Sequence, residues 1–262
     1  MQKYDYCACW EANAEAWSRL TRAGYDVYRD TLHTPAFLRM LPDVAGKCGL
    51  DVGCGEGNGA RELARMGAKM AGVDIAPTMI RHAEEEERRE PLDIRYYEAD
   101  ASHLPFSDSE FDFAAAFMSL MDVGDLAGVI NEVHRVLVPG GFLQFSILHP
   151  CFSPPVRKVH RDAGGTVRSV ELSGYFDHAE QMETWTFSSL PEEERETVRP
   201  FDTPYRHFPL SEWINMLIEA GFSIEQIEEP RATEEEAAKE PVIADTREFP
   251  LAMIVRVRKT AK

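Results

Sequence analysis

Residues 48–59 of this chain, CGLDVGCGEGNG, decide its fold: a short apolar run ends at Val52, and glycine then stands at every second position from Gly53 to Gly59. Glycine lets a backbone turn sharply and approach a ligand with no Cβ in the way. A helix predicted over residues 60–66 would offer that ligand free N–H groups and the positive end of its dipole. The stretch therefore predicts a strand, a ligand-binding turn and a helix.

The same alternation of strand and helix continues along the chain. Further strands are predicted at residues 69–73, 94–97, 111–117 and 142–148. Helical spacing is found over residues 77–89 and 126–137, and Pro139-Gly140-Gly141 predicts a turn before the fifth strand. Strands that alternate with helices at short spacing form βαβ units, so we predict an α/β fold with a parallel sheet. Its ligand crevice should lie at the carboxyl ends of the strands.

Helices are predicted on the N-terminal side of this core. Residues 11–41 are predicted to be helical, with breaks at Pro35 and Pro42, and one helical face carries Trp10, Ala14, Trp17 and Leu20. Residues 1–46 are therefore assigned to an N-terminal helical cap on the cofactor-binding core of residues 47–149.

The alternation stops after Leu148. Residues 150–209 are rich in Pro, Gly, Ser and charge, with strand-like pieces at 166–172 and 184–187, and we assign them to a lid or substrate insertion. Residues 210–262 complete the core. There Ser211 is predicted to cap a helix that ends before Gly221, and the last strands are placed at 223–227 and 251–257. The acidic run Glu234–Glu236 is interpreted as a solvated helix or loop.

Charge and composition exclude several classes of protein. The formal net charge is −17, which opposes binding to nucleic acid, because DNA- and RNA-binding proteins need a basic surface. No apolar run approaches the ~20 residues that span a bilayer, and residues 1–10 lack a signal pattern, so we expect no membrane partner and a cytoplasmic location. Five cysteines without a CxxC pair indicate reduced thiols, and Cys7, Cys9 and nearby His33 make too few ligands to predict a metal site.

Asp74 is the second feature that points to a nucleotide-like ligand. It ends the predicted second strand about twenty residues after the glycine turn, where a carboxylate can accept both ribose hydroxyls. That feature suits NAD as well as S-adenosylmethionine. The turn itself departs from the dinucleotide pattern GxGxxG, since Asn58 stands at the third glycine.

These motifs together resemble the class I S-adenosylmethionine-dependent methyltransferases, in particular those that act on small molecules. The resemblance covers roughly residues 47–148 and is carried by five motifs in order. They are residues 51–59, DIAPTM at 74–79, ADA at 99–101 with LPF at 104–106, FDF at 111–113 and RVLVPGG at 135–141. Val138 departs from the family, which often has lysine there. The resemblance implies a Rossmann-like, seven-stranded, mostly parallel sheet in the order 3-2-1-4-5-7-6, with the seventh strand antiparallel.

The resemblance also implies roles in binding S-adenosylmethionine and its product S-adenosylhomocysteine. The glycine turn, with Asp51, Gly53, Cys54 and Gly55, would hold the methionine part, and Asp74 the ribose. Adenine would pack on Ile75 and Met79. The hydrogen bonds to adenine would come from Asp100 and the Ala101 N–H. The sulfonium pocket would be lined by Phe117, Met118 and Ser119.

The acceptor side offers weaker signals. Methyl transfer from a sulfonium needs mainly correct positioning, and a general base only when the acceptor must lose a proton early. His149 follows the fifth strand and is our candidate base or hydrogen-bonding group, although it could also orient the lid. Further candidates for contact with the substrate, each of which could instead serve packing or solvation, are Trp17, Tyr28, Arg29, Trp185, Arg206 and His207.

We therefore predict an enzyme that transfers a methyl group from S-adenosylmethionine to an O, N or C atom of a small metabolite. A non-catalytic S-adenosylmethionine-binding protein and an NAD-dependent oxidoreductase stay open as alternatives. The sequence names neither the acceptor nor the oligomeric state.

Overall fold

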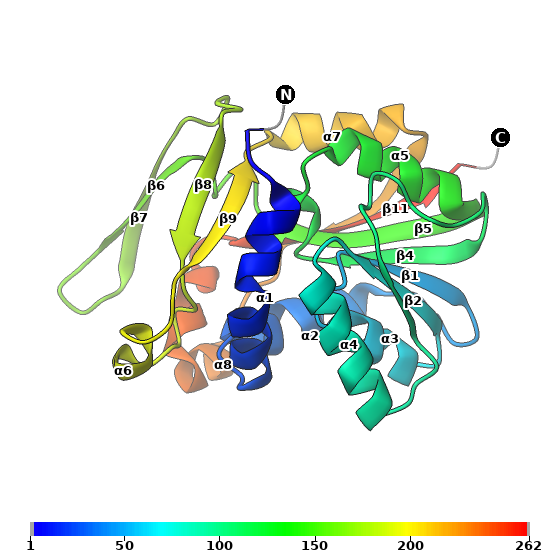
Figure 1. Ribbon diagram of the computed structural model, residues 1–262. Coiled ribbons are helices and arrows are strands. Elements are labelled where there is room, and N and C mark those ends of the chain that lie inside the picture. The colour runs from blue at the N-terminus through cyan, green and yellow to red at the C-terminus, as the bar shows by residue number, and fades with distance from the viewer. Residues whose placement is uncertain (1–2, 261–262) are drawn as a thin grey trace.

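The computed structural model describes residues 3–260, and a seven-stranded sheet forms its centre (Figure 1). The strands are β1 (Cys48–Val52), β2 (Lys69–Asp74), β3 (Arg95–Glu98), β4 (Phe111–Phe117), β5 (Leu137–Leu148), β10 (Phe222–Glu228) and β11 (Ala252–Lys259). Their order is β10-β11-β5-β4-β1-β2-β3. The strands from β3 to β5 are parallel, and β11 runs antiparallel to both β5 and β10. The predicted order, with its antiparallel seventh strand, is confirmed.

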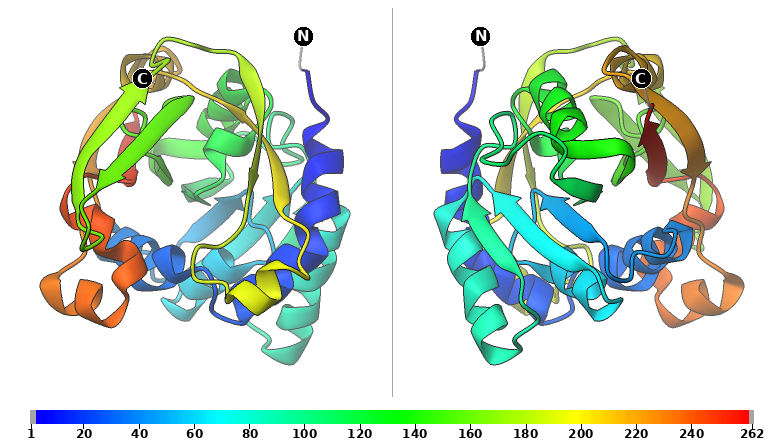
Figure 2. Two further views of the ribbon diagram at one scale, coloured as in Figure 1. Left: turned by 90° about the vertical axis from the view of Figure 1, so that its left-hand side faces the viewer. Right: turned by 90° about the vertical axis from the view of Figure 1, so that its right-hand side faces the viewer.

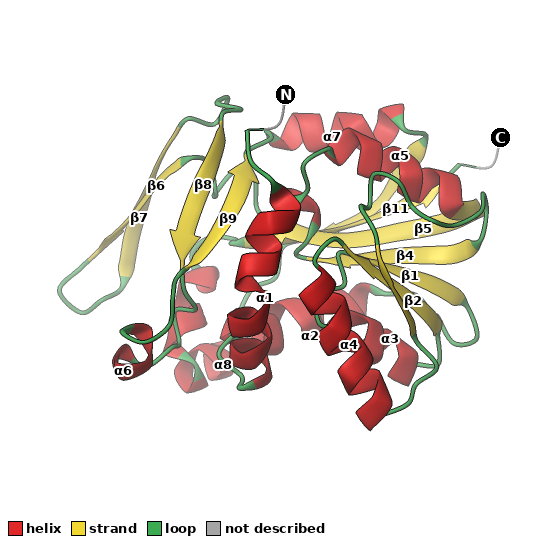
Figure 3. Cartoon of the chain, viewed as in Figure 1, coloured by secondary structure: helices red, strands yellow, loops and turns green. Residues whose placement is uncertain are grey.

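Helices cover both faces of the sheet (Figure 3). On one face lie α5 (Leu126–Val136) and α7 (Leu210–Glu219), and on the other α2 (Thr34–Met40) and α3 (Asn58–Arg65). Side chains of β4 alternate between these layers, with Ala114 in the first core and Phe113 in the second. This is the alternation expected of a strand buried on both faces.

The N-terminal helix α1 (Tyr6–Arg22) lies beside α4 (Pro77–Arg89) (Figure 2). The predicted apolar face is confirmed, since Trp10, Ala14 and Trp17 pack with Met79 of α4. A π-helix, η1 (Tyr28–His33), then leads into α2. The N-terminal residues therefore pack against the rest of the chain at two places, α1 on α4 and α2 on the sheet.

The segment after β5 forms two small antiparallel sheets beside the main one (Figure 1). One contains β6 (Val156–Arg161) and β7 (Val167–Ser173), and the other β8 (Glu180–Trp185) and β9 (Phe201–Arg206), with the short helix α6 (Glu192–Arg195) before β9. The predicted strand pieces overlap β7 and β8, whereas β6 and β9 were not predicted. Leu20 of α1 packs against Phe187 and Phe201, so the cap and this segment share a core.

Several predicted boundaries were wrong. Pro139-Gly140-Gly141 is not a turn before β5 but lies inside the strand, whose pairing with β4 shifts register there. Helix α7 begins at Leu210 after Pro209, so Ser211 is not its cap.

The remaining elements are short helices: η2 (Leu120–Asp122), α8 (Glu234–Lys239) and η3 (Pro241–Arg247). The acidic run Glu234–Glu236 opens α8, where Thr233 and Glu236 form a capping box. Within residues 3–260, no helix combines the length and the apolar character needed to cross a bilayer.

Candidate functional site

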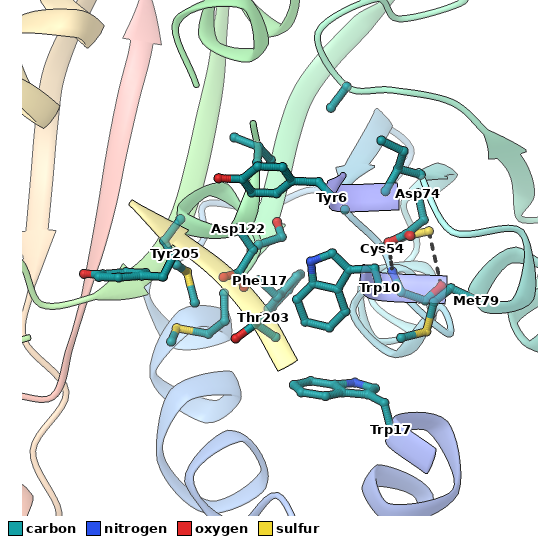
Figure 4. A pocket seen from close by; sticks show the side chains of 18 of the residues that line it. Tyr6, Trp10, Trp17, Cys54, Asp74, Met79, Phe117, Asp122, Thr203 and Tyr205 are labelled. Carbon is teal, nitrogen blue, oxygen red and sulfur yellow. Dashed lines mark hydrogen bonds between the residues drawn. The ribbon is translucent and has the colours of Figure 1, made fainter. Parts of the chain in front are cut away.

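A cavity of about 1420 Å³ opens at the carboxyl ends of β1, β2 and β4 (Figure 4). Its walls come from the loops after these strands, from α1 and η1, and from β8 and β9. Single small-molecule sites usually enclose roughly 300–1,000 Å³. The cavity therefore has room for two ligands side by side.

The glycine turn after β1 forms the floor of this cavity. Gly53 has φ +69°, and a Cβ there would lie 2.6 Å from Cβ of Ser119, so this position needs glycine for both backbone and space. Gly55 has φ +53° and faces open space, which a side chain would partly fill. Gly57 precedes α3 as its N-cap and brings no side chain to cap that helix, and in the first turn the Ala60 N–H points at the Asp51 carboxylate.

Asp51 lies beneath the turn, where its carboxyl group is buried. Only 1% of the surface of this residue is exposed, and neither carboxylate oxygen makes a well-formed hydrogen bond to the described residues, although the N–H of Ala60 in α3 points at the carboxylate and acts to lower its pKa. Burial raises the pKa of Asp51 to about 7. Because an unpaired buried carboxylate is costly, the site suits a ligand that brings a positive group. The ammonium group of S-adenosylmethionine fits this requirement.

Asp74 stands at the end of β2, on the opposite side of the turn. Its carboxylate accepts hydrogen bonds from the N–H groups of Gly55 (2.8 Å) and Ala76 (2.9 Å), and burial raises its pKa. These bonds fix the carboxylate but leave it lone pairs for further donors, such as ribose hydroxyls. Near it, Oδ1 of Asp100 accepts from the N–H and the hydroxyl of Ser102, both at 2.8 Å.

The loop after β4 brings a strained residue to the cavity. Met118 has φ +51°, a left-handed conformation that is uncommon outside glycine. Its N–H donates to the carbonyl of Ser146 (3.1 Å) and to the Ser146 hydroxyl (3.0 Å), while the Ser119 hydroxyl donates to the Val52 carbonyl (2.6 Å). These bonds over-determine the strained turn, which is typical of functional sites.

Most of the residues predicted from the sequence line this one cavity. From the predicted cofactor set these are Asp51, Gly53, Cys54, Gly55, Asp74, Ile75, Met79, Asp100, Ala101, Phe117, Met118 and Ser119. From the predicted substrate set they are Trp17, Tyr28, Arg29, Trp185 and Arg206.

His149 and His207 do not line it, and the structure does not place them where the prediction put them. Side chains alternate along β5, and Ser146 and Leu148 face the cavity, so His149 points away from it. There Nε2 donates to Oε1 of Glu229 (2.8 Å), and Nδ1 accepts from the Cys151 N–H (3.1 Å). His207 is buried and its Nε2 lies 3.0 Å from the Tyr175 carbonyl oxygen. Both histidines therefore make hydrogen bonds within or next to residues 150–209, outside the cavity.

The sequence reasoning missed Tyr6, Asp122, Glu183 and Tyr205, all of which line the cavity. For two of these residues, the sequence position could have indicated a place in the site. Asp122 follows the predicted Phe117–Ser119 motif by three residues, and Glu183 lies two residues before Trp185, on the same face of a strand. Tyr205 lies on β9, which was not predicted at all.

Comparisons with known proteins agree with this geometry. Residues 50–145 match the model of a family described as a methyltransferase domain. A demethylmenaquinone methyltransferase of Tropheryma whipplei is 35% identical over 131 residues, which cover 50% of this chain and 53% of that protein. Methyltransferase GfsG of Streptomyces halstedii is 41% identical over 133 residues, covering 50% of this chain and 43% of that protein. The chain thus spans about half the length of these curated relatives.

Likeness over most of the chain comes from a solved structure. An S-adenosylmethionine-dependent methyltransferase from Mesorhizobium loti superposes with a TM-score of 0.71 and 27% identity, covering 86% of this chain and 96% of that one. Residues 50–145 thus match the methyltransferase domain family, and the chain has the fold of the class I S-adenosylmethionine-dependent methyltransferases.

Proposed function

We propose that this chain transfers the methyl group of S-adenosylmethionine to an O, N or C atom of a small molecule. The observation that carries the proposal is the buried carboxylate of Asp51 beneath the glycine turn, which makes no ion pair within residues 3–260, so that a cationic group would stabilise it at the place where a methionine ammonium would bind. The volume of the cavity supports a second ligand beside the first. The net charge of −17 favours a small molecule over a nucleic acid as that ligand.

In this proposal the chain's own residues hold the cofactor, which supplies an electrophilic methyl group. Asp51 and the backbone at Gly53 and Gly55 hold its methionine part, and Asp74 accepts from its ribose. Adenine packs on Ile75 and Met79. Asp100 and the Ala101 N–H then bind the polar edge of adenine. The loop Phe117–Ser119, with strained Met118, surrounds the sulfonium.

Calorimetric titration tests the cofactor directly. S-adenosylmethionine and S-adenosylhomocysteine should bind, with NAD at least about a hundredfold weaker, and Asp74→Ala should cost about 2–4 kcal/mol of binding through lost charge-assisted hydrogen bonds. Glu84→Ala, an exposed change on α4, is the control and should bind as the parent does. Tight NAD binding without S-adenosylmethionine binding would show an oxidoreductase instead.

Transfer itself needs an acceptor screen. Incubation with methyl-labelled S-adenosylmethionine and panels of amines, phenols, carboxylic acids and carbon acids should yield a labelled product. Binding with no transfer to any panel would favour the non-catalytic alternative, because a shared fold does not fix a reaction.

A further inference from the structure

One end of the cavity is not used by the proposed cofactor residues. It lies among Tyr6 of α1, Asp122 of η2, and Glu183, Thr203 and Tyr205 of the β8–β9 sheet. Figure 4 shows Tyr6, Asp122 and Tyr205 on one side of the view and Asp74 and Met79 on the other. Asp122 follows Ser119 by three residues, so this end adjoins the proposed sulfonium pocket and is where an acceptor would bind.

Two carboxyl groups, those of Asp122 and Glu183, line this end of the cavity. Within residues 3–260, neither Asp122 nor Glu183 makes a side-chain hydrogen bond or an ion pair. Burial, and then the negative charge of Glu183, raise the pKa of Asp122 well above its usual range, and burial raises the pKa of Glu183. No lysine or arginine opposes either shift. By exposed surface Asp122 is half-buried and Glu183 is exposed, so both carboxyl groups are accessible to a ligand, and a cation beside them would relieve the repulsion that raises the pKa of Asp122.

Neighbouring carboxylates in the same region are compensated. Glu180 lies three residues before Glu183, and it accepts hydrogen bonds from the Tyr6 hydroxyl (2.7 Å) and the Lys3 N–H, with Arg206 at 3.7 Å. Although burial alone would raise the pKa of Glu180, these groups together lower it. Arg206, which also lines the cavity, is the cation beside Glu180, and within residues 3–260 its Nε has no hydrogen-bond partner. Glu180 therefore has hydrogen-bond partners and a nearby cation, whereas the side chains of Asp122 and Glu183 have no hydrogen-bond partner in the part of the chain that the structure describes.

The walls around the pair are aromatic. The polar atoms of three rings are engaged elsewhere: Tyr6 donates to Glu180, Tyr205 to the Ser153 carbonyl (2.9 Å) and the Trp185 Nε1–H to the Thr203 hydroxyl (3.0 Å). These residues therefore offer ring surface to the cavity. Ring surface beside carboxylates is a chemistry that recognises organic cations.

We propose that the methyl acceptor is a primary or secondary amine, bound as its ammonium ion between Asp122 and Glu183. This inference rests on the proposed function. The ammonium gives one proton to a carboxylate of the pair, and the freed nitrogen lone pair forms the new N–CH₃ bond. The S–CH₃ bond breaks and its electrons stay on sulfur. The products are a neutral carboxylic acid, a methylated ammonium and a thioether, so charge is conserved.

Binding of model compounds tests the proposal without knowing the natural acceptor. 2-Phenylethylamine, 2-phenylethanol and 3-phenylpropanoate share a ring and a chain but differ in charge. Each is titrated by ligand-observed NMR up to about 10 mM, with and without S-adenosylhomocysteine, and with EDTA to remove divalent ions that carboxylates also attract. The amine should bind at least about tenfold more tightly than the alcohol, and the propanoate should bind most weakly.

Matched variants locate the site. Asp122→Asn and Glu183→Gln should each weaken amine binding about five- to twentyfold while S-adenosylhomocysteine binding stays unchanged. Both remove an uncompensated charge, so both variants should fold. Glu193→Gln, an exposed change on α6 outside the cavity, should leave amine binding as it is in the parent.

Each contrary result is specific. Equal binding of amine and alcohol, preference for the propanoate, no amine binding, or amine binding that survives both cavity substitutions would overturn the amine proposal. If S-adenosylhomocysteine does not bind, the proposed function fails, and the titrations of the ligand-free protein still decide whether the cavity prefers amines.

Discussion

At the scale of single residues, the raised pKa of Asp51 should make binding of the cofactor depend on pH. Its pKa of about 7 in the ligand-free protein means that it is only half ionised at neutral pH. A bound cation would favour the ionised form and lower that pKa, so binding should release a proton below pH 7. Cofactor affinity should therefore depend on pH through this residue.

The affinity ratio of parent to Asp51→Asn for S-adenosylmethionine should fall about tenfold from pH 8 to pH 6. The direction follows because lower pH protonates the parent carboxyl, whereas asparagine has no proton to gain. Taking the ratio at each pH cancels titration of the ligand's own amino group. Calorimetry at several pH values measures it, and a ratio that stays constant would show that Asp51 does not contact a charged group.

Gly53 tests whether the turn needs glycine for space or for backbone freedom. Gly53→Ala should lower the free energy of unfolding by about 2–4 kcal/mol, because it adds left-handed strain to a contact with Ser119. Gly24 supplies the control, since its φ is +81° but a Cβ there meets nothing within 4 Å. Gly24→Ala should therefore lose only the backbone part, about 1 kcal/mol. Urea denaturation measures both free energies of unfolding, and equal losses for the two variants would show that the contact with Ser119 contributes nothing.

At the scale of elements, the start of α1 is fastened to β8 across the cavity. The Tyr6 hydroxyl donates to Glu180, and both side chains are buried. Tyr6 lines the cavity, so this hydrogen bond holds one of its walls in place. We expect the contact to slow release of the bound cofactor.

Tyr6→Phe should speed release of S-adenosylhomocysteine about fivefold and increase hydrogen exchange in the first turn of α1, because one buried hydrogen bond is lost. Tyr25→Phe is a matched control: its hydroxyl also donates to a glutamate, Glu194, but neither residue lines the cavity. Stopped-flow displacement compares the two variants. Identical release from parent and Tyr6→Phe would leave the contact with a structural role only.

The sequence predicted the elements of the core better than those of the insertion, for physical reasons. Buried parallel strands are continuous apolar runs that glycine and proline delimit, so β1 and β4 could be read directly. In contrast, β9 contains Pro204, which normally argues against a strand. It is tolerated here because, among the residues that the structure describes, β9 pairs with β8 alone and no second strand needs the missing N–H. Strand β6 is mostly charged and has no buried face to reveal it.

In the candidate site, too, the residues of the core motifs could be predicted, and those that depend on contacts between distant segments could not. The side chains before helices α3 and α4 lie in one cavity because strand ends meet at one edge of a parallel sheet, which motif spacing reveals. The direction of His149 depended on the pairing of β5 with β11, and its N–H donates to the Leu251 carbonyl (2.9 Å), more than a hundred residues along the chain. Asp122 and Glu183 also come from distant segments, and they line the same cavity only because residues 150–209 fold back over the edge of the sheet. Contacts between distant segments leave little trace in local sequence.

At the scale of the whole molecule, the excess of acidic groups opposes folding at neutral pH. There are 45 acidic and 28 basic side chains, so even complete pairing would leave 17 negative charges without a partner. Surface ion pairs contribute only about 0–1 kcal/mol each, whereas net charge acts on the compact state as a whole. Screening should therefore remove more repulsion than attraction.

Salt should accordingly stabilise this protein at pH 8, raising its melting temperature by a few degrees from about 0.01 M to 0.15 M NaCl, as the Debye length falls from about 30 Å to about 8 Å. The sign depends on the net charge, and the sequence pI of about 4.9 provides the control. Near pH 5 the repulsion is nearly balanced, so the same salt should have little effect or slightly lower the melting temperature by screening ion pairs. Differential scanning fluorimetry at both pH values makes the comparison. Equal stabilisation at pH 5 and pH 8 would mean that salt acts through the hydrophobic surface and not through charge, because exclusion of salt from apolar surface does not depend on the titration of carboxylates.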